Sequence, residues 1–130
     1  MTDQQGGPKG LLANATVAMP KDTNPNGDIF GGWLMSQMDL AGGIAAGRRA
    51  HGRTVTIAVQ EMTFLRPVPV GNLVSCFTEI LKVGRTSVTV KIEAWAQTHD
   101  DVDDPVKVTE GVFTYVAIDD AGKPREVPPE

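Results

Sequence analysis

One acidic side chain lies among small and apolar residues. Asp39 ends the stretch NGDIFGGWLMSQMD. On a helix it shares one face with four other residues, Met35, Gly42, Gly43 and Ala46. Glycine within a helix costs about 1 kcal/mol relative to alanine, so another group is expected to approach the backbone there. A carboxylate on such a face is costly to bury unless it is paired. Periodicity alone does not decide between a functional acid and an ordinary aspartate on the polar side of the helix.

The start of the same helix adds backbone donors. Gly31 and Gly32 are expected to expose N–H groups in the first turn, where the helix dipole also favours negative charge. Such donors can polarise a carbonyl oxygen, and Asp39 lies about two turns further along. Together they suit hydrolysis of an activated acyl group, with Asp39 as general base or nucleophile. Packing between the loop and the helix is the alternative explanation for the two glycines.

Other reactive groups are sparse. His51, His99 and the single cysteine, Cys76, lack the spacing of metal ligands, so we expect no metal. Cys76 falls in a strand pattern and is expected to be a small core residue. The acidic run Asp100–Asp104 lacks the glycine and the terminal glutamate of an EF-hand, and is typical of a solvated loop. Neither a G-x-S-x-G motif nor a P-loop is present.

Basic residues are the remaining candidates for binding a ligand. Arg48, Arg49 and Arg53 follow the expected helix, while Lys82 and Arg85 flank a glycine turn. Guanidinium and ammonium groups of this kind bind phosphate. Solvation of the surface is the alternative role for each of them.

One helix and five strands are expected to position these groups. The helix is predicted over residues 32–48, because apolar residues recur at steps of three and four: Phe30, Leu34, Met38, Ala41 and Ala45. His51 then follows as a loop or C-cap residue. Runs rich in β-branched residues predict the strands Leu11–Met19, Thr54–Leu65, Leu73–Val83, Thr86–Thr98 and Val106–Ile118.

The order β, α and four consecutive β predicts an α+β fold of two layers, with an antiparallel meander after the helix. The fourth strand alternates most cleanly. Val88, Val90, Ile92 and Ala94 are expected to face the core, and Ser87, Thr89, Lys91 and Glu93 the wetter side. Residues 1–10 are expected to be a disordered tail, residues 11–130 a single domain, His99–Pro105 a loop, and Asp119–Glu130 an exposed tail.

The totals of the chain limit the classes of function. Its 130 residues fit one domain with one core, and its net charge of −4 argues against non-specific binding to nucleic acid. No apolar run approaches the roughly 20 residues of a membrane span, and the N-terminus lacks the features of a signal peptide. With one cysteine, no internal disulfide can form, so we expect a cytoplasmic protein that binds neither membranes nor nucleic acid.

Three segments carry a family resemblance. MPKDTNPNGDIFGGWLMSQMD, HGRTVTIAVQEMTFLRPVPVGN and LKVGRTSVTVKIEAW strongly resemble the hot-dog-fold acyl-CoA thioesterases, especially their bacterial YciA-like branch. The resemblance covers nearly everything from Leu11 onward. It implies one long helix wrapped by an antiparallel sheet, and an enzyme that hydrolyses acyl-CoA to a free fatty acid and CoA. No cofactor is implied, because CoA is part of the substrate and the product.

The resemblance also implies roles for individual residues. Asp39 matches the catalytic aspartate of the family, as general base for water or as nucleophile through a mixed anhydride. Gly31 and Gly32 match the place where the thioester carbonyl is polarised, and Asn26 and Asp28 precede it as assisting candidates. A further segment resembles one near the CoA moiety, and its binding candidates are Gly84, Arg85, Thr86 and Ser87.

The resemblance further implies an oligomeric assembly, and two alternative functions stay open beside the thioesterase. Family members form dimers whose sheets join edge to edge, with active sites at the dimer interface, and the dimers commonly assemble into hexamers as trimers of dimers. The rival functions are a non-catalytic acyl-CoA-binding module and a hot-dog enoyl-thioester hydratase. The hydratases usually pair a histidine with an aspartate in a different motif, which this sequence lacks.

Overall fold

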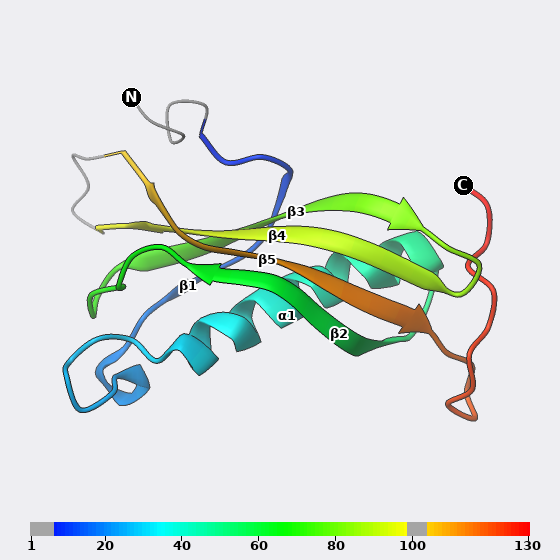
Figure 1. Cartoon of the computed structure of the whole chain (residues 1–130), viewed down its shortest axis with the longest axis horizontal. Helices are drawn as coiled ribbons and strands as arrows, with labels where there is room; N and C mark the ends of the chain where they lie inside the picture. The colour runs from blue at the N-terminus through cyan, green and yellow to red at the C-terminus, as the bar shows by residue number, and fades with distance from the viewer. Residues whose placement is uncertain (1–6, 99–103) are drawn as a thin grey trace.

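The computed structural model describes residues 7–98 and 104–130, which form one antiparallel sheet wrapped around one helix (Figure 1). The elements in chain order are β1 (Leu11–Val17), the short 3₁₀ turn η2 (Pro20–Asp22), α1 (Gly31–Ala50), β2 (Thr54–Phe64), β3 (Leu73–Val83), β4 (Ser87–Gln97) and β5 (Val106–Ala117). The element order and the α+β class follow the prediction, and strand ends differ from it by at most two residues. The long helix inside a curved sheet is the arrangement that the family resemblance implies.

Helix α1 begins one residue earlier and ends two residues later than predicted. Leu34, Met38 and Ala41 are buried, as their spacing predicts, whereas Phe30 precedes the helix and is 48% exposed. The helix ends at His51, which adopts a left-handed conformation with φ 55°. Its amide bonds back to the carbonyl of Arg48, so the C-cap alternative for His51 is confirmed.

The strands lie in the order β1-β3-β4-β5-β2, and all neighbours are antiparallel. The predicted meander therefore holds for β3, β4 and β5, but it is wrong for β2, which pairs with β5 at the far edge. Its connection to β3 explains this, because Pro67 and Pro69 favour extended backbone and exclude a tight hairpin. The connection crosses the end of the sheet, where Val68 is buried and its carbonyl accepts the amide of Ile29.

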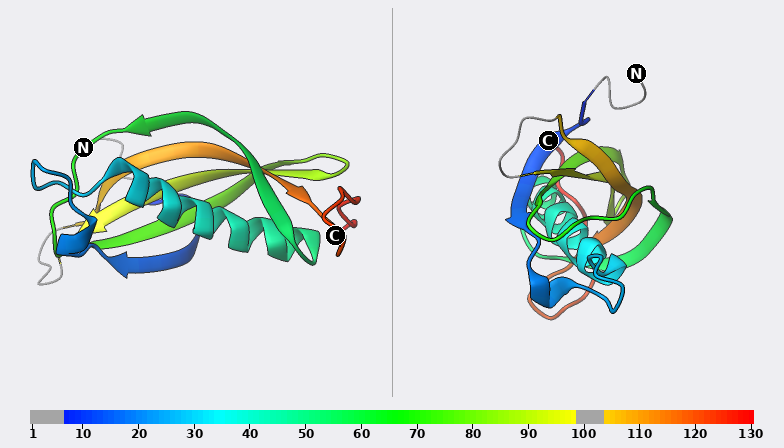
Figure 2. Two further views of the ribbon diagram at one scale, coloured as in Figure 1. Left: turned by 90° about the horizontal axis from the view of Figure 1, so that it is seen from below. Right: turned by 90° about the vertical axis from the view of Figure 1, so that its left-hand side faces the viewer.

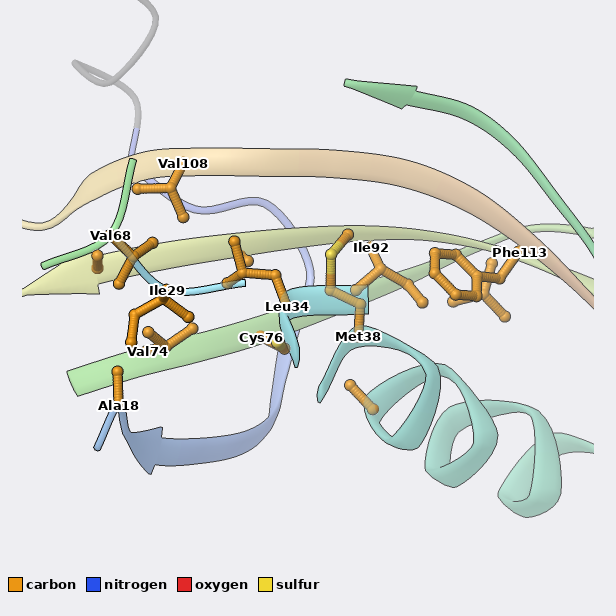
Figure 3. Packing of buried hydrophobic residues seen from close by; sticks show 14 of the residues in the cluster. Ala18, Ile29, Leu34, Met38, Val68, Val74, Cys76, Ile92, Val108 and Phe113 are labelled. Atoms are coloured by element: carbon orange, nitrogen blue, oxygen red, sulfur yellow. The ribbon is translucent and has the colours of Figure 1, made fainter. Parts of the chain in front are cut away.

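The core lies between α1 and the concave face of the sheet (Figure 2). Leu34 and Met38 extend from the helix towards Cys76 and Ile92 (Figure 3). On β4 the four residues predicted to face inward are fully buried: Val88, Val90, Ile92 and Ala94. Cys76 is likewise a fully buried core residue, as expected.

Glu93 corrects one detail of the β4 prediction. It points to the face away from the helix, as expected, but it is only 3% exposed. Its carboxylate accepts a hydrogen bond from Trp95 Nε1 at 2.9 Å, and Lys107 Nζ lies 3.8 Å away. A carboxylate can be buried there because it is paired, which the alternation of one strand does not reveal.

The segments outside the strands differ in how far they are described. Residues 1–6 of the predicted tail and residues 99–103 of the predicted acidic loop lie outside the described residues. The C-terminal segment is mostly exposed, as predicted, but it is anchored to the domain. Its Val127 packs against the core, and Arg49 Nη1 donates to the carbonyl of Pro128 at 2.6 Å.

Candidate functional site

Asp39 lies at the meeting point of α1, β2 and β5. Its side chain is half-buried, and its Oδ1 accepts two hydrogen bonds. Thr56 Oγ1 donates from 2.7 Å, and Tyr115 Oη donates from 3.0 Å. No described residue has a recorded hydrogen bond to Oδ2. One carboxylate oxygen is thus held in place while the other remains available.

The sheet brings the two donors together. Thr56 on β2 and Tyr115 on β5 are directly opposite each other in the antiparallel register. Directly opposite residues project to the same face of a sheet, here towards α1. Neither donor is among the residues predicted from the sequence. The alternation of Phe113, Tyr115 and Ala117 carried a signal, because a phenol on a core face needs an acceptor.

The protonation states of two buried groups limit the chemistry. Burial is the main cause that raises the pKa of Tyr115, and the neighbouring Asp39 charge raises it further. The phenol therefore remains a protonated donor at neutral pH. Burial also raises the pKa of Cys76 to about 12, so this thiol stays protonated and is a poor nucleophile.

The helix start supplies backbone donors, as its glycines predict. Phe30 occupies the N-cap position without a side-chain cap, and its carbonyl accepts the amides of Trp33 and Leu34. Within residues 7–98 and 104–130, the amides of Gly31 and Gly32 have no recorded acceptor. Free amides at a helix N-terminus can bind an oxygen that carries negative charge.

Asp28 and Gly31 line one cleft of about 330 Å³, together with Leu34 and Phe64. An added Cβ on Gly31 would lie 3.2 Å from the ring of Phe64, so the aromatic ring closely approaches the helix start. Asn26 lies in the preceding turn, where its backbone N–H donates to Asn24 Oδ1 at 2.9 Å. The recorded hydrogen bonds of Asn26 and Asp28 shape this turn.

Within one chain, Asp39 and the helix start are well separated along α1. Asp39 follows Gly31 by eight positions, which corresponds to about 12 Å along a helix at 1.5 Å per residue. The amide donors bind the carbonyl oxygen, whereas the carboxylate acts on the carbon either directly or through the activated water. The role of both parts of the helix at one thioester carbonyl stays a prediction.

The segment Gly84–Ser87 forms the turn between β3 and β4, near the C-terminal end of α1 (Figure 1). The amide of Gly84 donates to the carbonyl of Ser87 at 2.8 Å, and the carbonyl of Thr86 accepts from Ala117. Arg85 is 80% exposed, and its Nε lies 3.2 Å from Glu126 Oε2 on the C-terminal segment. The structure thus places this segment at the opposite end of α1 from Gly31.

A second groove, of about 490 Å³, lies between β1, β3 and the second half of α1. Leu12 and Ile44 are among its lining residues, and so are two of the basic candidates, Arg48 and Arg49. None of the residues predicted for catalysis, carbonyl polarisation or CoA binding lines it. Among the described residues, no group of three potential ligands could hold a metal ion. In the same part of the chain, no helix combines the length and apolar character needed to span a membrane.

Comparison with known proteins gives consistent matches. The thioesterase superfamily model matches residues 26–102. The acyl-CoA thioester hydrolase YciA of Escherichia coli (strain K12) is 53% identical over 125 residues, covering 95% of each chain.

Two solved structures share the fold. HI0827, a hexameric broad specificity acyl-coenzyme A thioesterase solved with one aspartate replaced by alanine, matches with a TM-score of 0.90 and 49% identity, covering 94% of this chain and 89% of that one. The hexameric thioesterase y2039 from Yersinia pestis gives a TM-score of 0.89 at 53% identity, covering 94% and 99%. The family model matches more than half of the chain, and relatives about 50% identical match it over nearly their full length. The chain therefore belongs to the thioesterase superfamily.

Proposed function

We propose that this chain is an acyl-CoA thioester hydrolase in which the Asp39 carboxylate acts on the thioester. One observation carries the proposal: Asp39 is half-buried, with Oδ1 held by Thr56 and Tyr115 and Oδ2 available. The family supports it, because the E. coli relative is named an acyl-CoA thioester hydrolase. A related thioesterase has also been studied with an aspartate replaced by alanine.

The carboxylate can act in two ways. As general base, it takes a proton from water while the water oxygen attacks the thioester carbon, and the C–S bond then breaks to release the CoA thiolate. As nucleophile, it attacks the carbon itself and expels the thiolate, and water hydrolyses the resulting mixed anhydride. In both routes negative charge develops on the carbonyl oxygen, where amide donors such as those of Gly31 and Gly32 stabilise it. Asp28 and Asn26 lie beside these donors as assisting candidates.

The spacing of these groups favours a site shared between two copies of the chain. Because about 12 Å of helix separates the two parts within one chain, Asp39 of one protomer would act with Gly31 and Gly32 of its partner. Strand β2 offers the matching surface, since it has an unpaired edge. It also exposes the apolar side chains Val55, Ile57 and Val59. The turn Gly84–Ser87, which lies far from its own helix start, would then hold CoA at the site.

Relatives guide the expected assembly. HI0827 and y2039 are both described as hexameric, so we propose a homohexamer built as a trimer of dimers. The cytoplasmic location and the free fatty acid product stay predictions from the sequence and the family resemblance.

A thiol-detecting reagent tests the function. Incubation with acyl-CoA should release the free thiol of CoA in proportion to enzyme. A non-catalytic binding module would bind acyl-CoA without releasing thiol. A hydratase would add water to an enoyl-CoA and leave its thioester intact, so either outcome would overturn the proposal.

Mixed oligomers test the shared site. Gly31→Pro removes the Gly31 amide at the first helical position, where proline is tolerated and where Phe30 already has a ψ of 136°. Gly31→Ala is the matched control, because it adds a Cβ and keeps the N–H. Gly31→Pro and Asp39→Asn subunits should each be nearly inactive alone, yet regain activity when mixed, because a mixed dimer keeps one intact site. Mixed oligomers as inactive as the parents would contradict the shared site.

A further inference from the structure

The hydroxyl of Tyr115 is in direct contact with Asp39. Tyr115 is 1% exposed, and its Oη is 3.0 Å from Asp39 Oδ1 and 2.9 Å from the Asp39 carbonyl oxygen. It therefore contacts both the side chain and the backbone of the same residue. We propose that Tyr115 is a positioning residue, which fixes the Asp39 carboxylate for catalysis, and that Gly42 is the helix position that admits its ring. This inference rests on the proposed role of Asp39.

Gly42 accounts for the close approach of Tyr115. It lies one turn after Asp39, and an added Cβ there would be 2.8 Å from Tyr115 Cζ and 2.6 Å from Ile92 Cδ1. Any side chain at this position would thus push the tyrosine ring away from the helix. At Gly43 the nearest atom to an added Cβ is Tyr115 Cε2 at 4.0 Å, which is ordinary contact. Only the first of the adjacent glycines makes room for the phenol.

The ring of Tyr115 is held in place by a neighbouring aromatic ring on β5. Phe113, two residues earlier on β5, stacks with Tyr115 at a centroid distance of 6.4 Å and an interplanar angle of 14°. Both side chains are buried in the core between α1 and the sheet. A phenol fixed in this way presents its hydroxyl from one direction, so Asp39 loses rotamer freedom when it accepts the bond.

The phenol donates in the chemical state that the mechanism needs. Because burial and the Asp39 charge raise the pKa of Tyr115, its O–H is retained where the enzyme works. A hydrogen bond donated to a carboxylate favours the ionised form, which is the form that acts as base or nucleophile. Tyr115 and Thr56 both bind Oδ1, so Oδ2 is the oxygen left for water or substrate.

Within residues 7–98 and 104–130, no charged side chain is recorded in contact with the Asp39 carboxylate. On α1 the arginines lie in the last turn, about 13 Å or more from Asp39 at 1.5 Å per residue. The charged residues of β2, β4 and β5 are on the face of the sheet that points away from α1: Glu61, Lys91, Glu93, Lys107 and Glu110. Among the described residues, Tyr115 is therefore the titratable group that faces the Asp39 carboxylate.

Tyr115→Phe tests the inference, because it keeps the ring and removes only the hydroxyl. We expect kcat to fall about tenfold to a hundredfold, the effect of losing one hydrogen bond to a charged group, with KM nearly unchanged. Thr109→Val is the matched control, because Thr109 Oγ1 is buried and has no recorded partner within the described residues. It should leave kcat and KM unchanged.

Double variants separate positioning from mere folding. In an Asp39→Asn background, Tyr115→Phe should reduce the residual kcat no further, because the group it positions is gone. If Tyr115→Phe does not fold, Gly42→Ala should reproduce the loss of kcat while Gly43→Ala does not. A Tyr115→Phe enzyme with wild-type kcat, beside an inactive Asp39→Asn enzyme, would overturn this inference and leave the proposed function standing. Full turnover of Asp39→Asn would overturn the proposed function and this inference with it.

Discussion

The two adjacent glycines of α1 provide a matched pair of substitutions. Alanine at either position improves helix propensity by about 1 kcal/mol, so this gain cancels in a comparison of the two variants. At Gly42 the new Cβ would lie 2.6 Å from Ile92 Cδ1 and 2.8 Å from Tyr115 Cζ, so the packed core must shift. Overpacking of this kind costs about 1–3 kcal/mol. At Gly43 the nearest atom would be 4.0 Å away, so no such cost arises.

We therefore expect Gly43→Ala to stabilise the protein by up to about 1 kcal/mol, and Gly42→Ala to be less stable than Gly43→Ala by about 1–3 kcal/mol. Gly42→Ala should also lose turnover, because Tyr115 is displaced from Asp39. Urea unfolding at one fixed protein concentration measures the free energies, since oligomers unfold in a concentration-dependent way. Equal stability and equal turnover of the two variants would refute the claim that Gly42 makes room for Tyr115.

Two further predictions concern charged groups. The hydrogen bond from Lys107 lowers the pKa of Glu110 in the folded protein. The pair therefore stabilises the fold above about pH 4, the pKa of a glutamate in the unfolded chain, and this stabilisation is lost as the pH falls through the lower pKa of the folded state. Glu110→Gln should therefore cost about 0.5 kcal/mol at pH 7 and nothing near pH 2, by thermal unfolding at both pH values. Arg85→Ala should raise KM for acyl-CoA about tenfold, while KM for a short thioester without the nucleotide stays the same. Glu126→Gln, which frees Arg85 from its recorded partner, should not raise either KM.

The local pattern of the sequence is enough to predict the elements. Leu34, Met38 and Ala41 recur at helical spacing and are buried in α1, and the alternation along β4 identifies its core face. Both signals arise within a few residues of chain. The place of β2 in the sheet depends instead on pairing with β5, so it is decided by contacts between distant segments and by the prolines that follow the strand.

The site divides in the same way. Asp39 and the helix-start glycines belong to one short stretch, so their types and spacing are visible in the sequence. The donors to Asp39 are not, because Thr56 is 17 residues away and Tyr115 is 76 residues away. Glycines 42 and 43 do predict a close approach to the helix, but only the fold reveals that Tyr115 makes this approach, and only at Gly42.

The most direct test of the account is the turnover of Asp39→Asn. The substitution keeps the size of the side chain and an oxygen that can accept from Thr56 and Tyr115, so the fold and the oligomer should be retained. Release of CoA from acyl-CoA should fall at least about a hundredfold, because the amide is neither a general base nor a nucleophile. Hydrolysis at the wild-type rate by this folded variant would contradict the account.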